Sequence, residues 1–464
     1  MNVSFFQELL TSIAERGRSL LDGTASEDTD GVLRDLAGAL LSGRGEATGV
    51  ALAGKILSIY RQAEDAEKIE FFKFLLDEFT PDQEKITAAA QAYLSQASSQ
   101  TLLELESAVH SPRQEFFRRL NLAPGATACI VAMRADLIGL LKKAPELAPV
   151  DADMKHLLGS WFNRGFLVLH RIDWSTSAST LEKIIEYEAV HEIRGWEDLR
   201  RRLDPADRRC FGFFHPSLVD EPLIFVEVAL TRDIPQSIQE LLGADAGPVG
   251  EPARPTTAVF YSISNCQIGL SGISFGNFLI KQVAEDLAKE IPSLKTFVTL
   301  SPAPRFAAWL VRLMGTHEGV EETETLGLLE DTSWAAHAEN HKKLESVLLP
   351  LAAEYFLEAK TSRGRPVDPV ARFHLGNGAR LEQINWLADK SAKGLRQSHG
   401  LMVNYLYDLK DIETNHEAYI NDNAIAASKS VHALLKTTER NKKHKNKKRK
   451  DPEMPENATV NANE

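Results

Sequence analysis

Ala258-Val259-Phe260-Tyr261-Ser262-Ile263-Ser264 begins the segment that says most about the fold, and Lys295-Thr296-Phe297-Val298-Thr299-Leu300 ends it. Both runs are rich in β-branched and aromatic residues, which predicts two buried strands. Between them, apolar residues at helical spacing predict a helix over residues 276–290. The order strand, helix, strand indicates mixed α/β structure in this part of the chain.

The loop between the first strand and the helix is rich in glycine. Gly269, Gly272 and Gly276 lie within eight residues, and glycine lets a backbone turn sharply and come close to a ligand. The N–H groups that open a helix lack internal partners, and the helix dipole adds positive character there. A phosphate or pyrophosphate is the natural ligand of such a loop. A glycine-rich turn without a ligand is the alternative interpretation.

The spacing of these glycines excludes the two best-known phosphate loops, because no G-x-G-x-x-G and no G-K-[ST] sequence is present. The loop resembles instead the pyrophosphate loop of the GNAT acyltransferase fold. Gln267 and Gly272 match that pattern, whereas Leu270 stands where the pattern has its first glycine. In the GNAT fold the two flanking strands splay apart around the thioester of acyl-CoA. The resemblance implies that Ser301, at the end of the second strand, faces the acyl group.

Composition and charge narrow the function classes. The 464 residues allow two or three domains, and 43% hydrophobic with 25% charged residues is typical of a globular protein. The net charge of −12 argues against general nucleic-acid binding, so an anionic substrate needs a local positive site. Cys129, Cys210 and Cys266 are too few and too scattered for a disulfide framework or a zinc site. We therefore expect no metal site.

The expected location is the cytoplasm, with no membrane partner. The first residues show neither the basic nor the apolar region of a signal peptide. No apolar run approaches the roughly 18–20 residues of a membrane span. The last three residues, Ala462-Asn463-Glu464, are not a peroxisomal signal.

The pattern along the chain predicts three parts. Residues 1–154 are expected to form an all-helical domain for packing or oligomerisation, with Thr80-Pro81 as an N-cap and first helical residue and Ser111 to Gln114 as a capping box. Residues 155–436 are expected to mix strands with helices. The predicted strands include 166–174, 209–214, 223–230 and 401–409, and the predicted helices include 179–193 and a closing helix over 419–435. Residues 437–464 carry a basic block and are expected to form a solvated tail, with nuclear targeting or polyanion binding as the alternative.

Two short strings carry candidate catalytic groups. Leu300-Ser301-Pro302-Ala303-Pro304 places a serine between an apolar run and two prolines, and Phe373-His374-Leu375-Gly376-Asn377-Gly378-Ala379 places a histidine before a Gly-Asn-Gly turn. Taken alone, Ser301 reads as a turn residue and His374 as a buried structural histidine. Asn265, Tyr261, Asn377 and Arg305 are further candidates without an assigned role.

These strings and several others resemble the malonyl-CoA decarboxylase family in content and order, over roughly residues 155 to 435. The others include His215-Pro216-Ser217-Leu218-Val219-Asp220-Glu221-Pro222, Phe278-Leu279-Ile280-Lys281, Asp368-Pro369-Val370-Ala371-Arg372, Ile384-Asn385-Trp386 and Gly400-Leu401-Met402-Val403-Asn404-Tyr405.

The resemblance implies an α+β protein, in which an all-helical N-terminal oligomerisation domain precedes a GNAT-like mixed α/β catalytic domain, assembled as a homotetramer. It implies decarboxylation of malonyl-CoA to acetyl-CoA and carbon dioxide, with Ser301 as the catalytic proton acceptor and His374 as the donor. It also implies that the CoA-binding residues are Ser271, Gly272, Ile273, Ser274, Phe275, Gly276 and Asn277. Ser274 departs from the family, because animal members carry a glutamate at this place.

The chemistry of malonyl-CoA explains why no cofactor is expected. Loss of carbon dioxide leaves two electrons on the α-carbon, and the thioester carbonyl holds them as an enolate. The protein must then orient the carboxylate, stabilise the oxyanion and protonate the α-carbon. The residues themselves do not divide these tasks between Ser301 and His374. A GNAT-type CoA-dependent acyltransferase and a non-catalytic CoA-binding scaffold are the alternatives.

Overall fold

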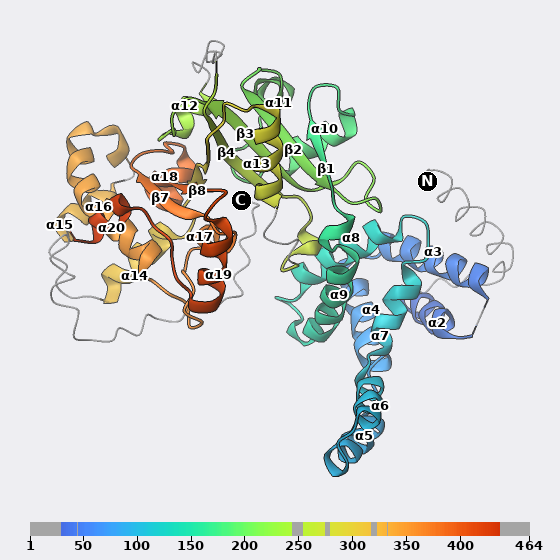
Figure 1. Cartoon of the computed structure of the whole chain (residues 1–464). Coiled ribbons are helices and arrows are strands. Elements are labelled where there is room, and N and C mark those ends of the chain that lie inside the picture. The colour runs from blue at the N-terminus through green and yellow to red at the C-terminus, as the bar shows by residue number, and fades with distance from the viewer. Residues whose placement is uncertain are drawn as a thin grey trace. The chain divides into compact units, whose positions relative to one another are not determined.

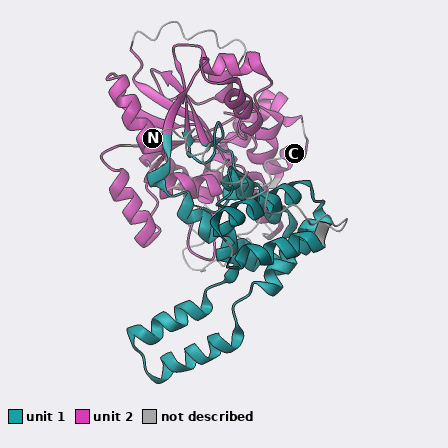
Figure 2. Ribbon diagram, turned by 90° about the vertical axis from the view of Figure 1, so that its right-hand side faces the viewer, with its two compact units in different colours: residues 1–168, 213–223, 265–275 teal, residues 169–212, 224–264, 276–464 magenta. Residues whose placement is uncertain are grey.

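The computed structural model describes residues 29–43, 45–243, 254–273, 279–316, 323–331 and 333–436 (Figure 1). The chain divides into two compact units (Figure 2). The first unit contains residues 1–168, 213–223 and 265–275. The second contains residues 169–212, 224–264 and 276–464.

The first unit is built mainly of helices. Its core is aromatic: Phe71, Phe72, Phe116 and Phe117 are fully buried, and their rings pack edge-on or tilted against one another. The helices are α2 (Thr29–Leu41), α3 (Glu46–Gln62), α4 (Asp65–Glu78), α5 (Gln83–Ser95), α6 (Ser99–Val109), α7 (Pro112–Leu120), α8 (Ala126–Leu140) and α9 (Ala148–Trp161), with short 3₁₀ turns at Pro145–Leu147 and Arg164–Phe166.

Helices α5 and α6 differ from the rest of this unit. They form a hairpin that stands away from the other helices of the unit (Figure 2), and neither contains a buried residue. Leu94 and Leu103 are 82% and 60% exposed. An apolar surface of this kind is typical of a helix pair that another protein chain covers.

The start of α5 differs from the sequence-based expectation, whereas the cap of α7 is the expected Ser111. The N-cap of α5 is Asp82 and not Thr80, because the Asp82 carboxylate accepts the N–H groups of Glu84 and Lys85. Helix α7 begins at Pro112, directly after its cap Ser111, whose hydroxyl accepts the N–H of Arg113. A carboxylate two residues further along therefore competes successfully with the Thr-Pro pair as a cap.

The second unit is organised around a mixed sheet, in which described strands pair in the order β1-β2-β3-β4-β5-β8-β6 and β7 pairs with β8. Strand β4 pairs with β5 in parallel, while β5, β6 and β7 each pair with β8 antiparallel. The α+β class with a helical first part is confirmed. The strands are β1 (Val168–Ile172), β2 (Arg208–Phe214), β3 (Pro222–Thr231), β4 (Thr257–Asn265), β5 (Thr296–Thr299), β6 (Ser301–Pro302), β7 (Arg380–Asn385) and β8 (Met402–Leu406).

Helices flank this sheet in the second unit. They are α10 (Ala178–Tyr187), α11 (Trp196–Leu203), α12 (Ile238–Leu242), α13 (Leu279–Glu290), α14 (Phe306–Thr316), α15 (Thr323–Gly327), α16 (Ala338–Leu357), α17 (Pro369–Gly376), α18 (Ala392–Ser398), α19 (Ile412–Asp422) and α20 (Lys429–Lys436), with 3₁₀ turns at Leu328–Glu330 and Trp334–Ala336. The expected single closing helix is wrong. Asn423, with φ +52°, ends α19, and a separate helix α20 follows.

Strands β4 and β5 pair for only part of their length. Their register runs from Thr257–Thr296 to Phe260–Thr299, and the N–H of Leu300 donates to the carbonyl of Phe260 at 3.0 Å. Beyond this point β4 continues to Asn265, whereas Ser301 pairs with Val403 of β8. Strand β4 and the β5–β6 segment therefore diverge at Ser301, as the likeness to the GNAT fold predicts.

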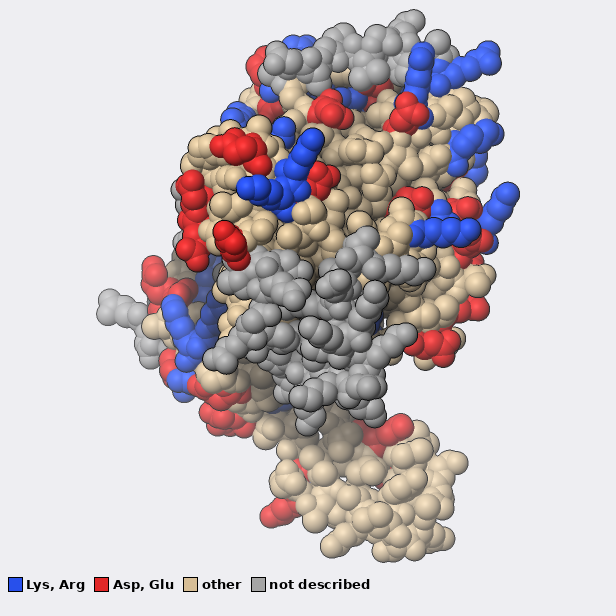
Figure 3. Space-filling model, turned by 90° about the vertical axis from the view of Figure 1, so that its left-hand side faces the viewer, with Lys and Arg blue, Asp and Glu red and all other residues tan. Residues whose placement is uncertain are grey.

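Several expectations fall outside the described residues: the loop over 247–252, the loop residues 274–277 with the expected helix start at 276, and the tail over 437–464. The domain boundaries at 154 and 436 stay predictions. Among the described helices, none is long and apolar enough to cross a membrane. Outside its grey atoms, the face in Figure 3 shows acidic and basic side chains interspersed, without one dominant positive patch.

Candidate active site

Helix α17 carries His374, and a buried cap fixes where this helix begins. Asp368 is fully buried, its Oδ1 accepts the N–H of Ala371 at 2.8 Å, and its Oδ2 accepts the hydroxyl of Tyr355 at 2.9 Å. Pro369 follows as the first helical residue. An aspartate cap and a proline with a preset φ are strong local signals for a helix start, so the position of His374 along the helix follows from the sequence Asp368-Pro369.

The end of α17 is fixed by a close approach of two backbones. Gly378 has φ +79°, and a β-carbon at this position would lie 2.1 Å from the carbonyl oxygen of Ile412 in α19. Only glycine fits, so the turn after Gly376 brings α17 against α19. His374 consequently lies in the last turn of α17, not in the turn itself.

The hydroxyl of Ser301 lies at the point where β4 and the β5–β6 segment diverge. It is almost fully buried. Its oxygen is 3.0 Å from Nε2 of His374 and 2.9 Å from the hydroxyl oxygen of Thr299, to which Ser301 donates. The structure therefore brings the two predicted residues together, although 73 positions separate them in the chain.

The imidazole ring of His374 is held on three sides. Besides the contact with Ser301, its Nδ1 lies 2.8 Å from the hydroxyl of Tyr407, and its face stacks on the ring of Tyr405 with 4.5 Å between centroids. Since the hydroxyl hydrogen of Ser301 points to Thr299, the hydrogen bond with His374 takes its proton from Nε2. In this assignment Nδ1 accepts the hydroxyl proton of Tyr407, and the neutral ring has both nitrogens engaged.

Burial sets the protonation state of this site. His374 is 2% exposed, and desolvation lowers its pKa from the usual 6.5 to about 3. Desolvation also raises the pKa of Tyr407 and of Tyr405 well above 10. At neutral pH the free protein therefore holds a neutral imidazole between two neutral hydroxyl groups.

Hydrogen bonds of Thr299 and Asn404 hold the segment that carries Ser301 in place. The hydroxyl oxygen of Thr299 also accepts the N–H of Tyr405 at 3.2 Å. The amide of Asn404, which is fully buried, donates to the carbonyl of Thr299 at 2.8 Å and accepts from Asn385. These bonds tie β8 to the β5–β6 segment where the regular ladder is interrupted, and they keep the backbone next to Ser301 in place.

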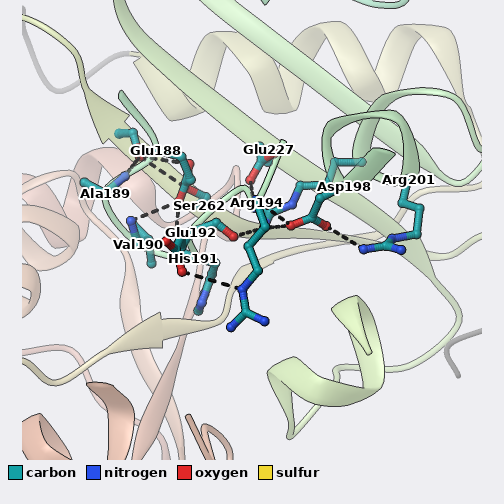
Figure 4. A network of polar contacts seen from close by, with 12 residues as sticks. Glu188, Ala189, Val190, His191, Glu192, Arg194, Asp198, Arg201, Glu227 and Ser262 are labelled. Carbon is teal, nitrogen blue, oxygen red and sulfur yellow. Dashed lines mark hydrogen bonds and ion pairs between the residues drawn. The ribbon is translucent and has the colours of Figure 1, made fainter. Parts of the chain in front are cut away.

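A second polar cluster lies on the same face of β4. Phe260 points to this face, because its ring packs 6.5 Å from that of Tyr407, and Ser262 and Ser264 alternate with it along the strand. Figure 4 shows the carboxylate of Glu188 directed at Ser262. Glu188 accepts the hydroxyl of Ser262 at 2.8 Å and that of Ser264 at 3.1 Å. It also accepts two backbone N–H groups, from Val190 and His191, at 2.9 and 2.7 Å.

The described part of the glycine-rich loop belongs to the first unit, where it packs on α8 and α9. A β-carbon at Gly269 would lie 1.9 Å from the carbonyl oxygen of Val131, so the loop touches α8 at a position where only glycine fits. The buried guanidinium of Arg134 donates to the carbonyls of Gly269 and Ser271 at 2.7 and 3.0 Å. It is held in turn by Asp151 at 2.8 Å.

Of the seven predicted CoA-binding residues, the structure describes Ser271, Gly272 and Ile273. Gly272 has φ +73°, as expected for a glycine that turns the chain sharply. Ser274, Phe275, Gly276 and Asn277 lie outside the described residues. Within the described part of the chain, no group of three or more His, Cys, Asp or Glu side chains could hold a metal ion.

Sequence reasoning missed Thr299, Tyr405, Tyr407, Glu188 and Arg134. A signal existed for some of them. Thr299 lies two residues before Ser301 and therefore shares its face of an extended chain. Tyr405 and Tyr407 are likewise two residues apart in the predicted strand 401–409, so the pattern places both on one face of that strand. Tyr261 faces the opposite side of β4, in a core cluster with Val259, Val298 and Leu300, and so does not join the site.

Comparison with known proteins adds independent findings. A family model described as malonyl-CoA decarboxylase C-terminal domain matches residues 165–445, and one described as malonyl-CoA decarboxylase N-terminal domain matches residues 79–162. The mitochondrial malonyl-CoA decarboxylase of Anser anser anser is 36% identical over 84% of this chain and 84% of its own length. That of Rattus norvegicus is 35% identical over 82% of this chain and 84% of its own length.

Solved structures agree with these matches. The malonyl-CoA decarboxylase structure from Rhodopseudomonas palustris is 52% identical, with a TM-score of 0.84, and the match covers 88% of this chain and 100% of that one. The structure from Agrobacterium vitis is 54% identical, with a TM-score of 0.82 and coverage of 87% and 99%. The helical first part, the mixed sheet and the Ser301–His374 pair thus occur in a chain that belongs to the malonyl-CoA decarboxylase family of carboxy-lyases.

Proposed function

We propose that this protein converts malonyl-CoA to acetyl-CoA and carbon dioxide at the Ser301–His374 pair. Membership of the family supports the reaction. The observation that supports the site is the 3.0 Å contact between Ser301 Oγ and His374 Nε2, buried at the divergence of β4 and the β5–β6 segment. A hydroxyl and an imidazole in this arrangement supply the acid and base groups that the reaction needs.

The reaction balances with one proton from solvent and no other reactant besides malonyl-CoA. The bond between the α-carbon and the malonyl carboxylate breaks, carbon dioxide leaves, and the electron pair passes into the thioester as an enolate. One proton from the site then adds to the α-carbon and gives acetyl-CoA. Solvent restores the proton to the site.

In this mechanism Ser301 accepts a hydrogen bond or proton and His374 donates one. The free protein holds His374 neutral because burial lowers its pKa to about 3. A malonyl carboxylate beside the pair adds a negative charge, which favours the protonated imidazole and so raises its pKa. As the carboxylate leaves, the proton has a new acceptor in the carbanion.

The arrangement favours decarboxylation over transfer of an acyl group. An acyltransferase needs a free base to deprotonate its acceptor, or a serine activated as a nucleophile. Here the lone pair of His374 Nδ1 faces the hydroxyl of Tyr407, and the Ser301 hydroxyl donates to Thr299 and not to the imidazole. In the free protein, His374 therefore has no lone pair available to deprotonate an acceptor, and Ser301 is not activated as a nucleophile.

The thioester enolate makes the reaction independent of metal and of organic cofactors, which is part of the proposal. The CoA part of the substrate binds to the loop that contains Ser271 to Asn277, in which the φ of +73° at Gly272 supports a close approach of the pyrophosphate. We also propose a cytoplasmic homo-oligomer, a tetramer by family resemblance. The exposed leucines on α5 and α6 support association with another chain.

One assay separates the proposal from its alternatives. Purified protein is incubated with malonyl-CoA and no second substrate, and acetyl-CoA and carbon dioxide are both quantified. A decarboxylase produces them in equal amounts. An acyltransferase requires an acceptor before acyl-CoA is consumed, and a CoA-binding scaffold leaves malonyl-CoA unchanged; either result contradicts the proposal.

A further inference from the structure

We propose that the ammonium group of Lys155, on helix α9 of the N-terminal helical region, binds a phosphate group of the acyl-CoA substrate beside Gly272. This inference rests on the proposed function and adds to it a phosphate-binding residue from outside the glycine-rich loop. All the groups on which it depends lie within the first unit of the chain.

Lys155 extends to the turn of the glycine-rich loop. A β-carbon on Gly272 would lie 2.9 Å from its Nζ and 3.2 Å from its Cε. The ammonium group thus occupies the space that any other side chain at position 272 would fill. Both Lys155 and Gly272 are exposed to solvent, so a ligand can reach them.

The carboxylate that is placed to pair with Lys155, that of Asp151, pairs with Arg134 instead. Asp151 lies one helical turn before Lys155 on α9, a spacing that favours an ion pair. Its Oδ1 instead binds Nε of Arg134 at 2.8 Å. Among the described residues, no hydrogen bond or ion pair satisfies the Lys155 ammonium, which leaves its three donors available.

The loop offers a further donor at the same place. Arg134 draws the carbonyl oxygens of Gly269 and Ser271 toward α8, and the N–H groups of Leu270, Ser271 and Ile273 bond within the loop. The N–H of Gly272 has no partner among the described residues. A lysine ammonium next to an available N–H at a glycine turn matches the way proteins bind phosphate oxygens.

The charge of the protein makes such a group necessary. The chain carries a net charge of −12, and the substrate is an anion with a pyrophosphate and a 3′-phosphate. A fixed cation at the loop offsets the long-range repulsion between them. Lys155 meets this need while Arg134, buried and paired with Asp151, serves to hold the loop.

The test compares Lys155→Met with wild type and with Lys142→Met, a matched removal of an exposed lysine elsewhere in the same unit. Equilibrium binding of CoA is measured by calorimetry, and steady-state kinetics are measured with malonyl-CoA. We expect Lys155→Met to weaken CoA binding and to raise KM by about tenfold or more, the usual scale for a lost hydrogen bond to a charged group. The kcat should stay within about twofold, because Lys155 does not touch the reacting atoms. Lys155→Arg should retain most of the affinity, and Lys142→Met should behave as wild type.

Truncated substrates show whether phosphate is the group recognised. With malonyl-pantetheine, which carries no phosphate, kcat/KM should be equal for wild type and Lys155→Met. With malonyl-3′-dephospho-CoA, a defect that persists indicates the pyrophosphate, and a defect that disappears indicates the 3′-phosphate; both support the proposal.

Unchanged CoA affinity in Lys155→Met, or an equal loss with malonyl-pantetheine, would overturn it. Since calorimetry with CoA requires no turnover, a wild-type protein that binds CoA but releases no carbon dioxide would contradict the proposed function and leave this test intact.

Discussion

The hydroxyl of Tyr407 lies 2.8 Å from Nδ1 of His374, while Ser301 lies 3.0 Å from Nε2 on the other side of the ring. Because the Ser301 hydroxyl donates to Thr299, the neutral imidazole carries its proton on Nε2 and directs it toward the serine. The Tyr407 hydroxyl then donates to the unprotonated Nδ1 and stabilises this tautomer. These contacts link the segment that continues strand β8 to Ser301 on β6 through the imidazole of His374.

Ser301→Ala and His374→Ala should each lower kcat for malonyl-CoA by roughly 100-fold or more, the scale of a lost acid–base group. The physical reason is the loss of the buried hydroxyl–imidazole contact. Acetyl-CoA formation by the purified variants measures this, with circular dichroism as the control for folding. A folded variant with near-normal turnover would remove that residue from the mechanism.

Tyr407→Phe should lower kcat about tenfold or more and leave KM nearly unchanged, because the ring of His374 stays in place but Nδ1 loses the hydroxyl that stabilises the Nε2–H tautomer. Tyr419→Phe is the matched control, since the buried Tyr419 hydroxyl has no partner among the described residues. Steady-state kinetics of both variants decide the matter. Equal activity in the two variants would show that Tyr407 has no positioning role.

The buried His374 should make the protein sensitive to acid. Its pKa is about 3 in the folded state and about 6.5 in the unfolded chain, so the unfolded state binds more protons between these values. The stability contributed by this depressed pKa is complete above pH 6.5 and decreases as the pH falls toward 3. Between pH 7 and pH 5, wild type should lose about 2 kcal/mol more unfolding free energy than His374→Gln. Urea denaturation at the two pH values measures this, and parallel losses would contradict it.

Asp368→Ala should destabilise the protein by about 2–4 kcal/mol, because it removes the cap of α17 and leaves the Tyr355 hydroxyl unpaired in the core. It should also lower kcat, since α17 carries His374. The matched control is Asp82→Ala at the exposed cap of α5, which should cost about 1 kcal/mol without affecting kcat. Urea unfolding and kinetics on both variants test this, and a full kcat in a destabilised Asp368→Ala would separate the cap from catalysis.

Activity should survive extensive dialysis against EDTA and should not respond to avidin. In the proposed mechanism the thioester enolate stores the charge that a metal or biotin would otherwise stabilise, and Ser274 offers no carboxylate in the loop for a divalent ion. The measurement is acetyl-CoA formation before and after each treatment. Recovery of lost activity on adding a divalent metal would show that the cofactor-free mechanism is wrong.

Much of the site was predictable where its signals are local. The strands around Phe260 and Val298 and the glycine-rich loop are determined by neighbours in the chain. Helix α17, which carries His374, was not predicted, although Asp368 and Pro369 are local signals for its start. The closing helix was not predicted correctly, because Asn423 adopts a left-handed φ of +52° and starts a turn that the apolar pattern does not reveal. The cap of α5 was misplaced because Thr80 and Asp82 both suit an N-cap, and the hydrogen bonds of Asp82 decide between them.

The amino-acid sequence was enough to predict the helical first part, the strand–loop–helix–strand unit and, through its family resemblance, Ser301 and His374 as the candidate pair. The folded structure was needed to show that Tyr407 and Thr299 complete the hydrogen-bond chain, and that Arg134 and Lys155 from α8 and α9 contact the loop near Gly272. The physical reason is the distance along the chain between the residues that interact. Helix caps, strands and turns follow from contacts between near neighbours. His374 and Gly269, in contrast, lie 33 and 135 positions from their partners Tyr407 and Arg134 and are brought to them by packing.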